Sequence, residues 1–491
     1  MPKYQRRTLA TVAAGGAAVQ KSSKKEGDIS DAFVSLSGAK RDPLPDRFRT
    51  LKCDLVRGRE KQITESWNRL LRDLKRENEI IAQKGSQVVP QIEFADLESG
   101  LNSLEGEIKK RGAVVVRGVV PEAEARAYKE EVEEYVKKNP WTRAFPADNP
   151  QVYELYWSAP QLKARSHPNF MRVQQRLMGA LWHASDPTSP ISVTEPLSYA
   201  DRLRIRQPGD ATFALGPHMD GGSVERWEPE GYGRGGVYDA VFDGAWERYD
   251  PWDASGRVAA VNNLYDGLGA CSAFRMWQGW LSMSRTRPAE GTLLVHPLMH
   301  RAAAYVLLRP LFAAVDRDST RAGYLDEANW ALVGEDRMTS DLQGASPGHG
   351  QELTDELHPH LELERTMVHV PEIKPGDFVA WHCDTIHAVD KVHQGASDSS
   401  VLYIPVCPVT AINAQYVARQ REAWRRGTPG PDFPGGEGEA RHANRPTEEM
   451  LRQWAGRDAL RSMGLEKLEA APTATPGQRE VVAQANTILG F

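Results

Sequence analysis

The sequence contains the stretch Gly216-Pro217-His218-Met219-Asp220-Gly221-Gly222, in which a histidine and an aspartate stand two positions apart. On an extended segment such side chains project to the same face and can hold one metal ion together. An imidazole and a single carboxylate suit Fe(II), and a third ligand from elsewhere would complete a facial triad with three open positions. Because His-x-Asp pairs often occur by chance, a surface polar pair near a turn is the alternative interpretation.

The third ligand is expected within residues 375–387. There a Gly-Asp turn leads into an apolar strand, 378–381, and histidines stand at positions 382 and 387. Another strand, 400–406, follows directly, as the closure of a small barrel requires. A second His-x-Asp pair begins at His382, so the spacing alone leaves both His382 and His387 as candidates.

Helical patterns are predicted towards both ends of the chain, and strands in its centre. The expected helices are 59–84, 94–111, 122–138, 160–184, 415–426 and 447–462. The expected strands are 113–118, 202–206, 274–283, 292–295, 378–381 and 401–406. Two long connections, 225–265 and 315–360, are interpreted either as a cover for the site or as ordinary insertions, and they contain Trp227, Trp246, Trp252 and Trp330.

Composition and charge exclude several classes of protein. The 491 residues include 61 Lys and Arg against 66 Asp and Glu, and this balance excludes a strongly basic nucleic-acid-binding protein. No apolar run approaches the roughly 18 residues that a membrane span needs, so no membrane insertion is expected. The four cysteines include no C-x-x-C pair, which argues against a disulfide framework or a structural zinc site and favours the reducing cytoplasm. The acid-free, basic first 25 residues predict a disordered tail or, as the alternative, a mitochondrial transit peptide.

Several stretches resemble the Fe(II)/2-oxoglutarate-dependent oxygenases of the clavaminate synthase-like group, and in particular their YbiU-type family. The resemblance extends over about residues 50–425. The stretches that carry it are 112–122, 199–210, 216–222, 274–281, 290–297 and 381–387. That family comprises bacterial and fungal proteins without an assigned substrate, placed among the proteins with a double-stranded β-helix.

The resemblance implies a fold and a set of iron ligands. The expected fold is a mainly β, jelly-roll or cupin-like core with flanking N- and C-terminal helices. Its expected divisions are a disordered tail over 1–48, an oxygenase-like domain over 49–425 and a helical extension over 426–491. The implied ligands are His218, Asp220 and His387, with no further catalytic residue. His382 and Trp381 are then neighbours of the site rather than ligands.

The binding of 2-oxoglutarate departs from the usual pattern of these enzymes. They carry an Arg or Lys about 9–14 residues after the last histidine ligand, whereas residues 396–401 contain no base. A carboxylate needs such a partner, because a guanidinium matches its geometry and offsets its desolvation. The candidates for this role are Arg275, Arg204 and Arg206, and Tyr403 can add a hydroxyl group.

The expected function is that of a dioxygenase, an oxidoreductase that uses Fe(II), O2 and 2-oxoglutarate to oxidise a small-molecule substrate, with release of succinate and CO2. Two alternatives keep the barrel without this reaction. One is a cupin-like isomerase or lyase that uses the metal as a Lewis acid. The other is a barrel that binds a ligand without catalysis. The net charge of −5 argues against a nucleic-acid substrate.

Overall fold

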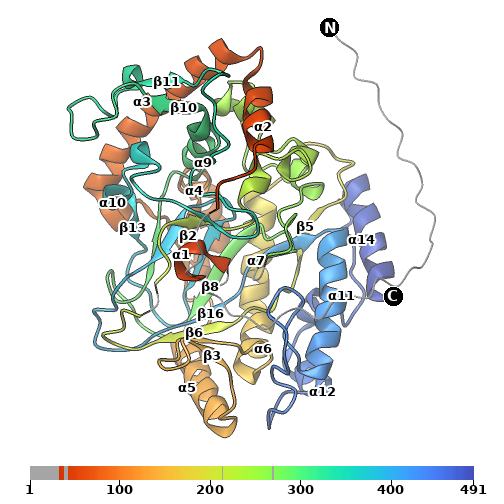
Figure 1. Cartoon of the computed structure of the whole chain (residues 1–491). Coiled ribbons are helices and arrows are strands. Elements are labelled where there is room, and N and C mark those ends of the chain that lie inside the picture. The colour runs from red at the N-terminus through yellow and green to blue at the C-terminus, as the bar shows by residue number, and fades with distance from the viewer. Residues whose placement is uncertain (1–31, 38–41, 213, 268–269) are drawn as a thin grey trace.

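Two β-sheets form the centre of the molecule, and helices from both ends of the chain surround them (Figure 1). The computed structural model describes residues 32–37, 42–212, 214–267 and 270–491. The basic N-terminal stretch, expected to be a tail or a targeting segment, lies outside these residues. Among the helices described, none is both long and apolar enough to cross a membrane.

The two sheets contain most of the strands. The larger sheet has the order β1 (Gln91–Glu93), β2 (Ala113–Arg117), β14 (Phe378–His382), β8 (Trp277–Ser282), β16 (Ser399–Tyr403), β6 (Leu203–Arg206), β4 (Val152–Tyr153) and β3 (Ala144–Phe145). The smaller sheet has the order β12 (Gln351–Glu352), β7 (His218–Met219), β15 (His387–Val389), β9 (Leu293–Val295) and β13 (Val368–His369). Two further pairs consist of β10 (Phe312–Ala314) with β11 (Trp330–Leu332), and of β17 (Cys407–Val409) with β5 (Ser192–Leu197).

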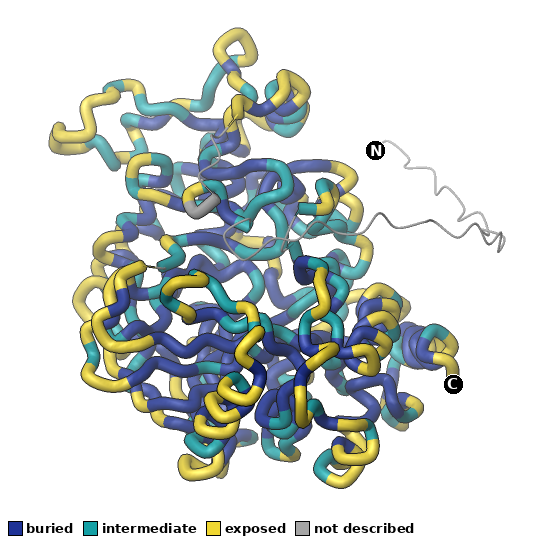
Figure 2. Tube along the Cα trace, turned by 60° about the horizontal axis from the view of Figure 1, so that its bottom comes forward, coloured by how far each residue is buried: buried dark blue, intermediate teal, exposed yellow. Residues whose placement is uncertain are grey.

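Consecutive strands alternate between the two sheets from β6 to β9 and again from β13 to β16, with β12 of the smaller sheet and the separate pair of β10 and β11 between these runs. In chain order, β6, β8, β14 and β16 belong to the larger sheet, and β7, β9, β13 and β15 belong to the smaller one. The pairing among these strands is antiparallel throughout. Figure 2 shows that buried residues are concentrated in this strand-rich region. The predicted central strands and flanking helices are therefore present.

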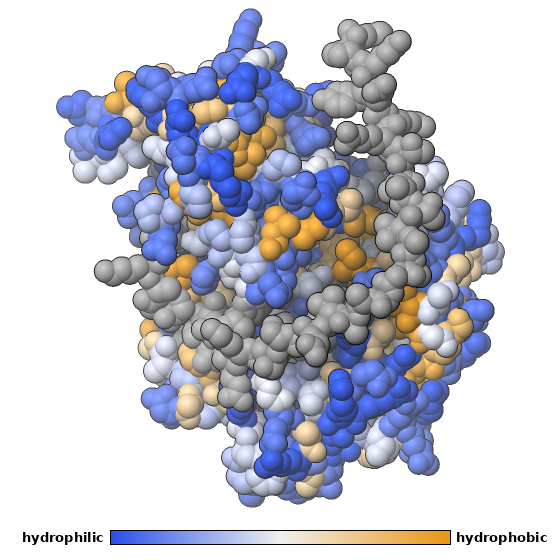
Figure 3. Space-filling view, turned by 45° about the vertical axis from the view of Figure 1, so that its right-hand side comes forward, coloured by the Kyte–Doolittle hydropathy of each residue, from blue (hydrophilic) through white to orange (hydrophobic). Residues whose placement is uncertain are grey.

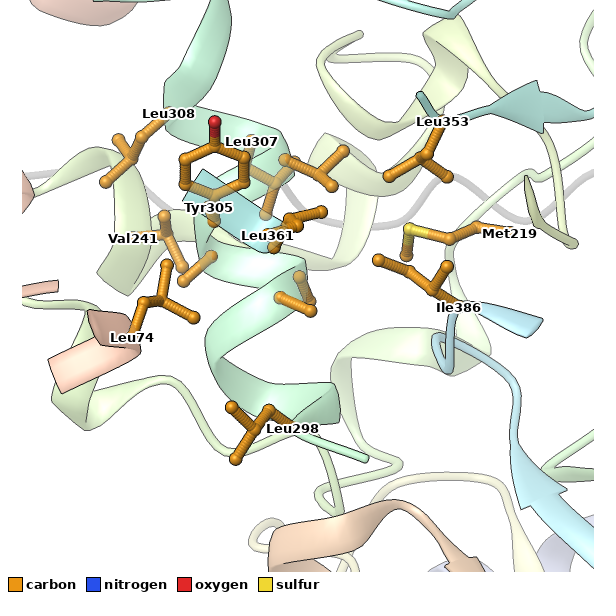
Figure 4. Packing of buried hydrophobic residues seen from close by; sticks show 14 of the residues in the cluster. Leu74, Met219, Val241, Leu298, Tyr305, Leu307, Leu308, Leu353, Leu361 and Ile386 are labelled. Atoms are coloured by element: carbon orange, nitrogen blue, oxygen red, sulfur yellow. The ribbon is translucent and has the colours of Figure 1, made fainter. Parts of the chain in front are cut away.

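The N-terminal helices pack in two apolar clusters. These helices are α1 (Val34–Ser37), α2 (Arg47–Val56), α3 (Glu60–Lys84), α4 (Leu97–Arg111) and α5 (Glu122–Lys138). Helices α2 and α3 contribute to one cluster, and α4 and α5 contribute to a second cluster that includes strands of the larger sheet. On α3, Trp67 is fully buried and stacks on Phe312 with ring centroids 4.4 Å apart. Leu74 from the same helix lies beside the central helix α9 (Met299–Leu308), as Figure 4 shows. The helical spacing predicted for residues 59–84 thus matches the buried face of α3.

The C-terminal helices pack on one another and on the pair of β5 and β17, and they differ in detail from the prediction. They are α11 (Ala411–Arg426), α12 (Glu448–Trp454), α13 (Arg457–Ser462) and α14 (Pro476–Leu489).

The single helix expected over 160–184 is two, α6 (Ala159–Ser166) and α7 (Pro168–Leu181), because Pro168 begins a new helix. Gly456 likewise divides the helix expected over 447–462. The short helices α8 (Asp239–Phe242) and α10 (Leu363–Thr366) complete the set described.

The two long connections are tightly packed. Their four tryptophans are only 3–5% exposed, and none of them lines the cavity described below: Trp227, Trp246, Trp252 and Trp330. On the face shown in Figure 3, apolar side chains form small patches among hydrophilic ones. The burial of the four tryptophans favours the interpretation of both connections as packed insertions.

Gly112 joins α4 to β2 and supports the turn that precedes β15. Its φ of 66° is left-handed, and an added Cβ would lie 2.4 Å from Cβ of Met299 and 2.7 Å from Oγ1 of Thr385. Replacement by alanine is expected to lower the free energy of unfolding by about 1–3 kcal/mol, through overpacking and backbone strain, as measured by urea denaturation. Gly106→Ala is the matched control, because this site on α4 has open space and alanine favours a helix. Equal effects of the two variants would contradict the packing described at Gly112.

Candidate metal centre

Three side chains of the predicted triad come together at the smaller sheet. Strands β7 and β15 pair so that His218 lies directly opposite His387, and Asp220 follows β7 immediately. The Nε2 atoms of both histidines lie 3.8 Å from carboxylate oxygens of Asp220. All three potential ligand atoms lie within 4.8 Å of one another, a spacing that one metal ion can bridge.

Hydrogen bonds orient the two imidazoles. Nδ1 of His218 lies 2.7 Å from the carbonyl oxygen of Gly216, and Nδ1 of His387 lies 3.0 Å from that of Thr385. Each Nδ1–H can therefore donate to the backbone, which leaves Nε2 with a lone pair for a metal. Within the described residues, neither Nε2 makes a hydrogen bond of its own.

Core packing fixes the strands that carry these ligands. Met219 and Ile386, which are sequence neighbours of His218 and His387, are buried in the apolar cluster around α9. Figure 4 shows the two side chains lying side by side, with Leu353 close to them. Because side chains alternate across a strand, burial of these apolar neighbours turns the two histidines towards the opposite face.

The charges at the triad favour the forms that bind metals. Burial alone would raise the pKa of Asp220, but His387, His218 and Arg275 together lower this pKa to about 2. Burial, together with His218, lowers the pKa of His387 to about 3, against the opposing effect of Asp220. At neutral pH the carboxyl group is therefore ionised and the His387 imidazole is neutral, as metal coordination requires.

The competing group His382, Cys383 and Asp384 also has its potential ligand atoms close together, but its contacts are structural. Nε2 of His382 lies 3.0 Å from the carbonyl oxygen of Pro251, and Nδ1 accepts from the amide of Asp384 at 3.0 Å. The ring also stacks on Trp182 with centroids 4.7 Å apart. Both nitrogens of His382 are thus engaged in hydrogen bonds within the fold.

Asp384 is equally committed to other partners. Its carboxylate forms a buried ion pair with Arg257 at 2.5 Å and accepts hydrogen bonds from the hydroxyl groups of Tyr238 and Tyr249. Burial alone would raise the pKa of Asp384, but Arg257, His382 and Arg226 together hold this pKa well below its usual range. Asp384 therefore stabilises the packing of the 225–265 connection against the segment that follows β14.

The triad opens onto a cavity of about 180 Å³. Side chains from both sheets line this cavity, including three of the four candidates for binding 2-oxoglutarate: Arg204, Arg275 and Tyr403. Trp381, the expected neighbour, also lines it, and its ring centroid lies 5.0 Å from that of His387. The strand β6 carries Arg204 and the paired strand β16 carries Tyr403.

Arg206 occupies a different environment, although it lies on the same strand as Arg204. Its Nε donates to the carboxylate of Asp210 at 2.6 Å, and its other nitrogens donate to the backbone carbonyl groups of Asp210, Asp390 and Lys391. The side chain is fully buried and does not line the cavity. Arg206 therefore links the 203–210 segment to residues 390–391, and these bonds make it unavailable for a bound carboxylate.

Two residues at the site had no clear signal in the sequence. Phe33 falls within the segment expected to be a tail, yet it is 6% exposed, lines the cavity and meets His218 edge to face with centroids 4.8 Å apart. The backbone of this segment is fixed by a hydrogen bond from Gly350 to Ala32. Gln278 on β8 interacts with Asp220 and also lines the cavity. Phe33 is an isolated phenylalanine in a polar stretch, and Gln278 is a single glutamine in a strand. Neither residue is part of a sequence pattern that indicates a functional site.

Comparison with known proteins identifies relatives along most of the chain. The family model described as Gig2-like matches residues 42–465. The protein YbiU of Escherichia coli, which is described as uncharacterised, is 31% identical over 78% of this chain and 85% of its own.

Solved structures agree with this relationship. The crystal structure of GlcNAc Inducible Gene 2 from Candida albicans has a TM-score of 0.80 and 31% identity, over 92% of this chain and 97% of its own. A Salmonella typhimurium LT2 protein named as a candidate oxidoreductase has a TM-score of 0.73 and 29% identity, over 86% of this chain and 98% of its own. These matches confirm the resemblance to the YbiU-type family. The chain belongs to the Gig2-like family.

Proposed function

We propose that this protein is a non-haem Fe(II)/2-oxoglutarate-dependent dioxygenase that acts on a small molecule. The observation that carries the proposal is the group of His218, Asp220 and His387 beside a cavity, with both Nε2 atoms directed towards one carboxylate. Two imidazoles and one carboxylate on one side of a metal are the ligand set of non-haem Fe(II) oxygenases. The name of the Salmonella relative, a candidate oxidoreductase, agrees with this class of reaction.

We further propose that the two central sheets form a double-stranded β-helix. The strands from β6 to β9 and from β13 to β16 alternate between the sheets, and the pairs among them are antiparallel. Between these two runs, β12 also belongs to the smaller sheet and β10 pairs separately with β11. Such a fold places the side chains of facing sheets in an enclosed interior, and the cavity is lined from both sheets. This arrangement supports the expected jelly-roll class.

The residues present fit the proposed metal and cosubstrate. His218, Asp220 and His387 would hold Fe(II), and Thr385 and Gly216 would keep the imidazoles oriented through their carbonyl groups. Bound Fe(II) with 2-oxoglutarate supplies the O2-dependent oxidation of a substrate, with release of succinate and CO2. The remaining task of the chain is to orient the cosubstrate and limit solvent access, and the buried walls of the cavity serve this role.

Arg204 and Tyr403 are the proposed partners of the far carboxylate of 2-oxoglutarate. Burial lowers the pKa of the Arg204 guanidinium and raises that of the Tyr403 hydroxyl, and the mutual interaction of the two groups opposes both shifts. A carboxylate bound between them would offset the cost of burying the guanidinium.

Arg204→Gln is expected to weaken 2-oxoglutarate binding by roughly 10- to 150-fold, because a charged hydrogen bond contributes about 1.5–3 kcal/mol. The measurement is an anaerobic titration of the Fe(II) protein with 2-oxoglutarate, and Arg204→Lys should restore part of the affinity. Arg202→Gln is the matched control, since Arg202 lines the same cavity but pairs with Asp201. Equal loss in both variants would contradict the assignment of Arg204.

A further inference from the structure

We propose that Arg275 recognises an anionic group of the oxidised substrate, which makes this substrate a small molecule that carries a carboxylate or a phosphate. The inference deepens the proposed dioxygenase function and rests on it. It assigns to Arg275 a role separate from the binding of the far carboxylate of 2-oxoglutarate.

The Arg275 guanidinium is enclosed but lacks a strong partner. Its side chain is 15% exposed. Its ion-pair partner is Asp220, with 4.0 Å between a guanidinium nitrogen and a carboxylate oxygen. It lies over the ring of Tyr199 at 5.5 Å, which supports one flat side of the group. Among the described residues it makes no hydrogen bond, although a guanidinium has five N–H donors. Because unpaired donors are costly to bury, this group is suited to an anionic ligand.

Three cavities meet at this side chain. Arg275 lines the large cavity of the triad and also two smaller cavities of about 50 Å³ each. The lining of one smaller cavity combines apolar side chains with four neutral hydrogen-bonding ones: Asn262, Ser272, Gln278 and Thr410. A second arginine, Arg257, lines it too, but its charge is paired with Asp384. Among the described residues that line this cavity, Arg275 is therefore the cation without a close counter-ion, next to the proposed metal.

The position of Arg275 does not suit the far carboxylate of 2-oxoglutarate. The two carboxyl groups of that molecule are separated by three carbon atoms, so the far one must lie well away from a metal chelated by the keto acid end. Arg275 lies 4.0 Å from a proposed metal ligand, whereas Arg204 and Tyr403 line only the large cavity. A metal bound to Asp220 would also reduce the repulsion between this carboxylate and an anion at Arg275.

The test uses the full-length protein loaded with Fe(II) and saturating 2-oxoglutarate under argon. Inorganic phosphate, acetate and the neutral analogue acetamide are titrated by calorimetry, and saturation with 2-oxoglutarate blocks the site at Arg204. Phosphate or acetate is expected to bind and acetamide is not. Arg275→Gln should weaken anion binding at least 10-fold, and Arg275→Lys should retain part of it. Arg172→Gln, at an exposed arginine that pairs with Glu98 and lines none of the three cavities, should leave it unchanged.

Two results would overturn the proposal. One is unchanged anion affinity in Arg275→Gln. The other is a loss of 2-oxoglutarate affinity of 10-fold or more in that variant, which would assign the guanidinium to the cosubstrate instead. Failure of the proposed function gives a different result. In that case the wild-type protein with Fe(II) does not bind 2-oxoglutarate, which the titration with 2-oxoglutarate shows before any anion is added.

Discussion

Fe(II) binding is expected to fall at least about 100-fold when Asp220 or His387 is replaced by alanine. Mutation of a residue that merely supports a ligand typically costs 10–100-fold in metal affinity, and removal of one of three ligands should exceed that range. Both side chains are buried or half-buried at a site whose three potential ligand atoms lie within 4.8 Å of one another. The measurement is an anaerobic competition of the protein against a chelator of known Fe(II) affinity.

His183→Ala is the matched control for this experiment. Its side chain is 46% exposed and its nearest partner is Asp250 at 3.5 Å, so it has no part in the triad. Metal affinity should therefore stay at the wild-type value in this variant. If Asp220→Ala and His387→Ala bind Fe(II) as tightly as His183→Ala, the metal is held elsewhere and the triad is incorrectly assigned.

Asp384→Ala is expected to lower the free energy of unfolding by about 3–5 kcal/mol without weakening metal binding. The substitution leaves Arg257 as a buried charge without its counter-ion, and loss of one partner of a buried pair has this cost. The measurement is urea denaturation followed by fluorescence. The control is Asp326→Ala, which breaks a largely exposed pair with Lys75 and should cost at most about 1 kcal/mol.

The ion pair of Asp384 with Arg257 is also expected to make the free energy of unfolding depend on pH. Because the folded protein holds the pKa of Asp384 below its unfolded value of about 3.9, its contribution is fully present above that pH and is lost as the pH falls towards the folded pKa. Wild type should therefore lose its stability advantage over Asp384→Ala only at strongly acidic pH. A variant as stable as wild type at neutral pH, or one that no longer binds Fe(II) when folded, would contradict the structural role of Asp384.

The sequence allows the β core and the location of the triad to be predicted because both have short-range signals. Alternation in residues 202–206 matches β6, and the two-residue spacing of His218 and Asp220 matches the end of β7. The choice between His382 and His387 needed the resemblance to a family, since spacing does not reveal hydrogen bonds. In the structure, His382 stacks on Trp182 and meets Trp252 edge to face, and both of its nitrogens are engaged in hydrogen bonds.

Other features depend on long-range packing and had no local signal. Arg204 and Arg206 have the same pattern on one strand, but Asp210 and two distant carbonyl groups engage only Arg206. Phe33 reaches the cavity from a segment whose composition resembles a tail. The division between α6 and α7 follows from Pro168, a helix-starting position that the apolar pattern obscured.

The most direct test of the proposed function is an anaerobic titration of the purified protein with Fe(II) and 2-oxoglutarate, followed in the visible range. A chelated keto acid on Fe(II) gives a weak charge-transfer band. We expect this band in wild type and its absence in Asp220→Ala and His387→Ala. A wild-type protein that binds Fe(II) but shows no band with 2-oxoglutarate would contradict the dioxygenase proposal and favour a cupin-like isomerase or lyase that uses the metal without a keto acid.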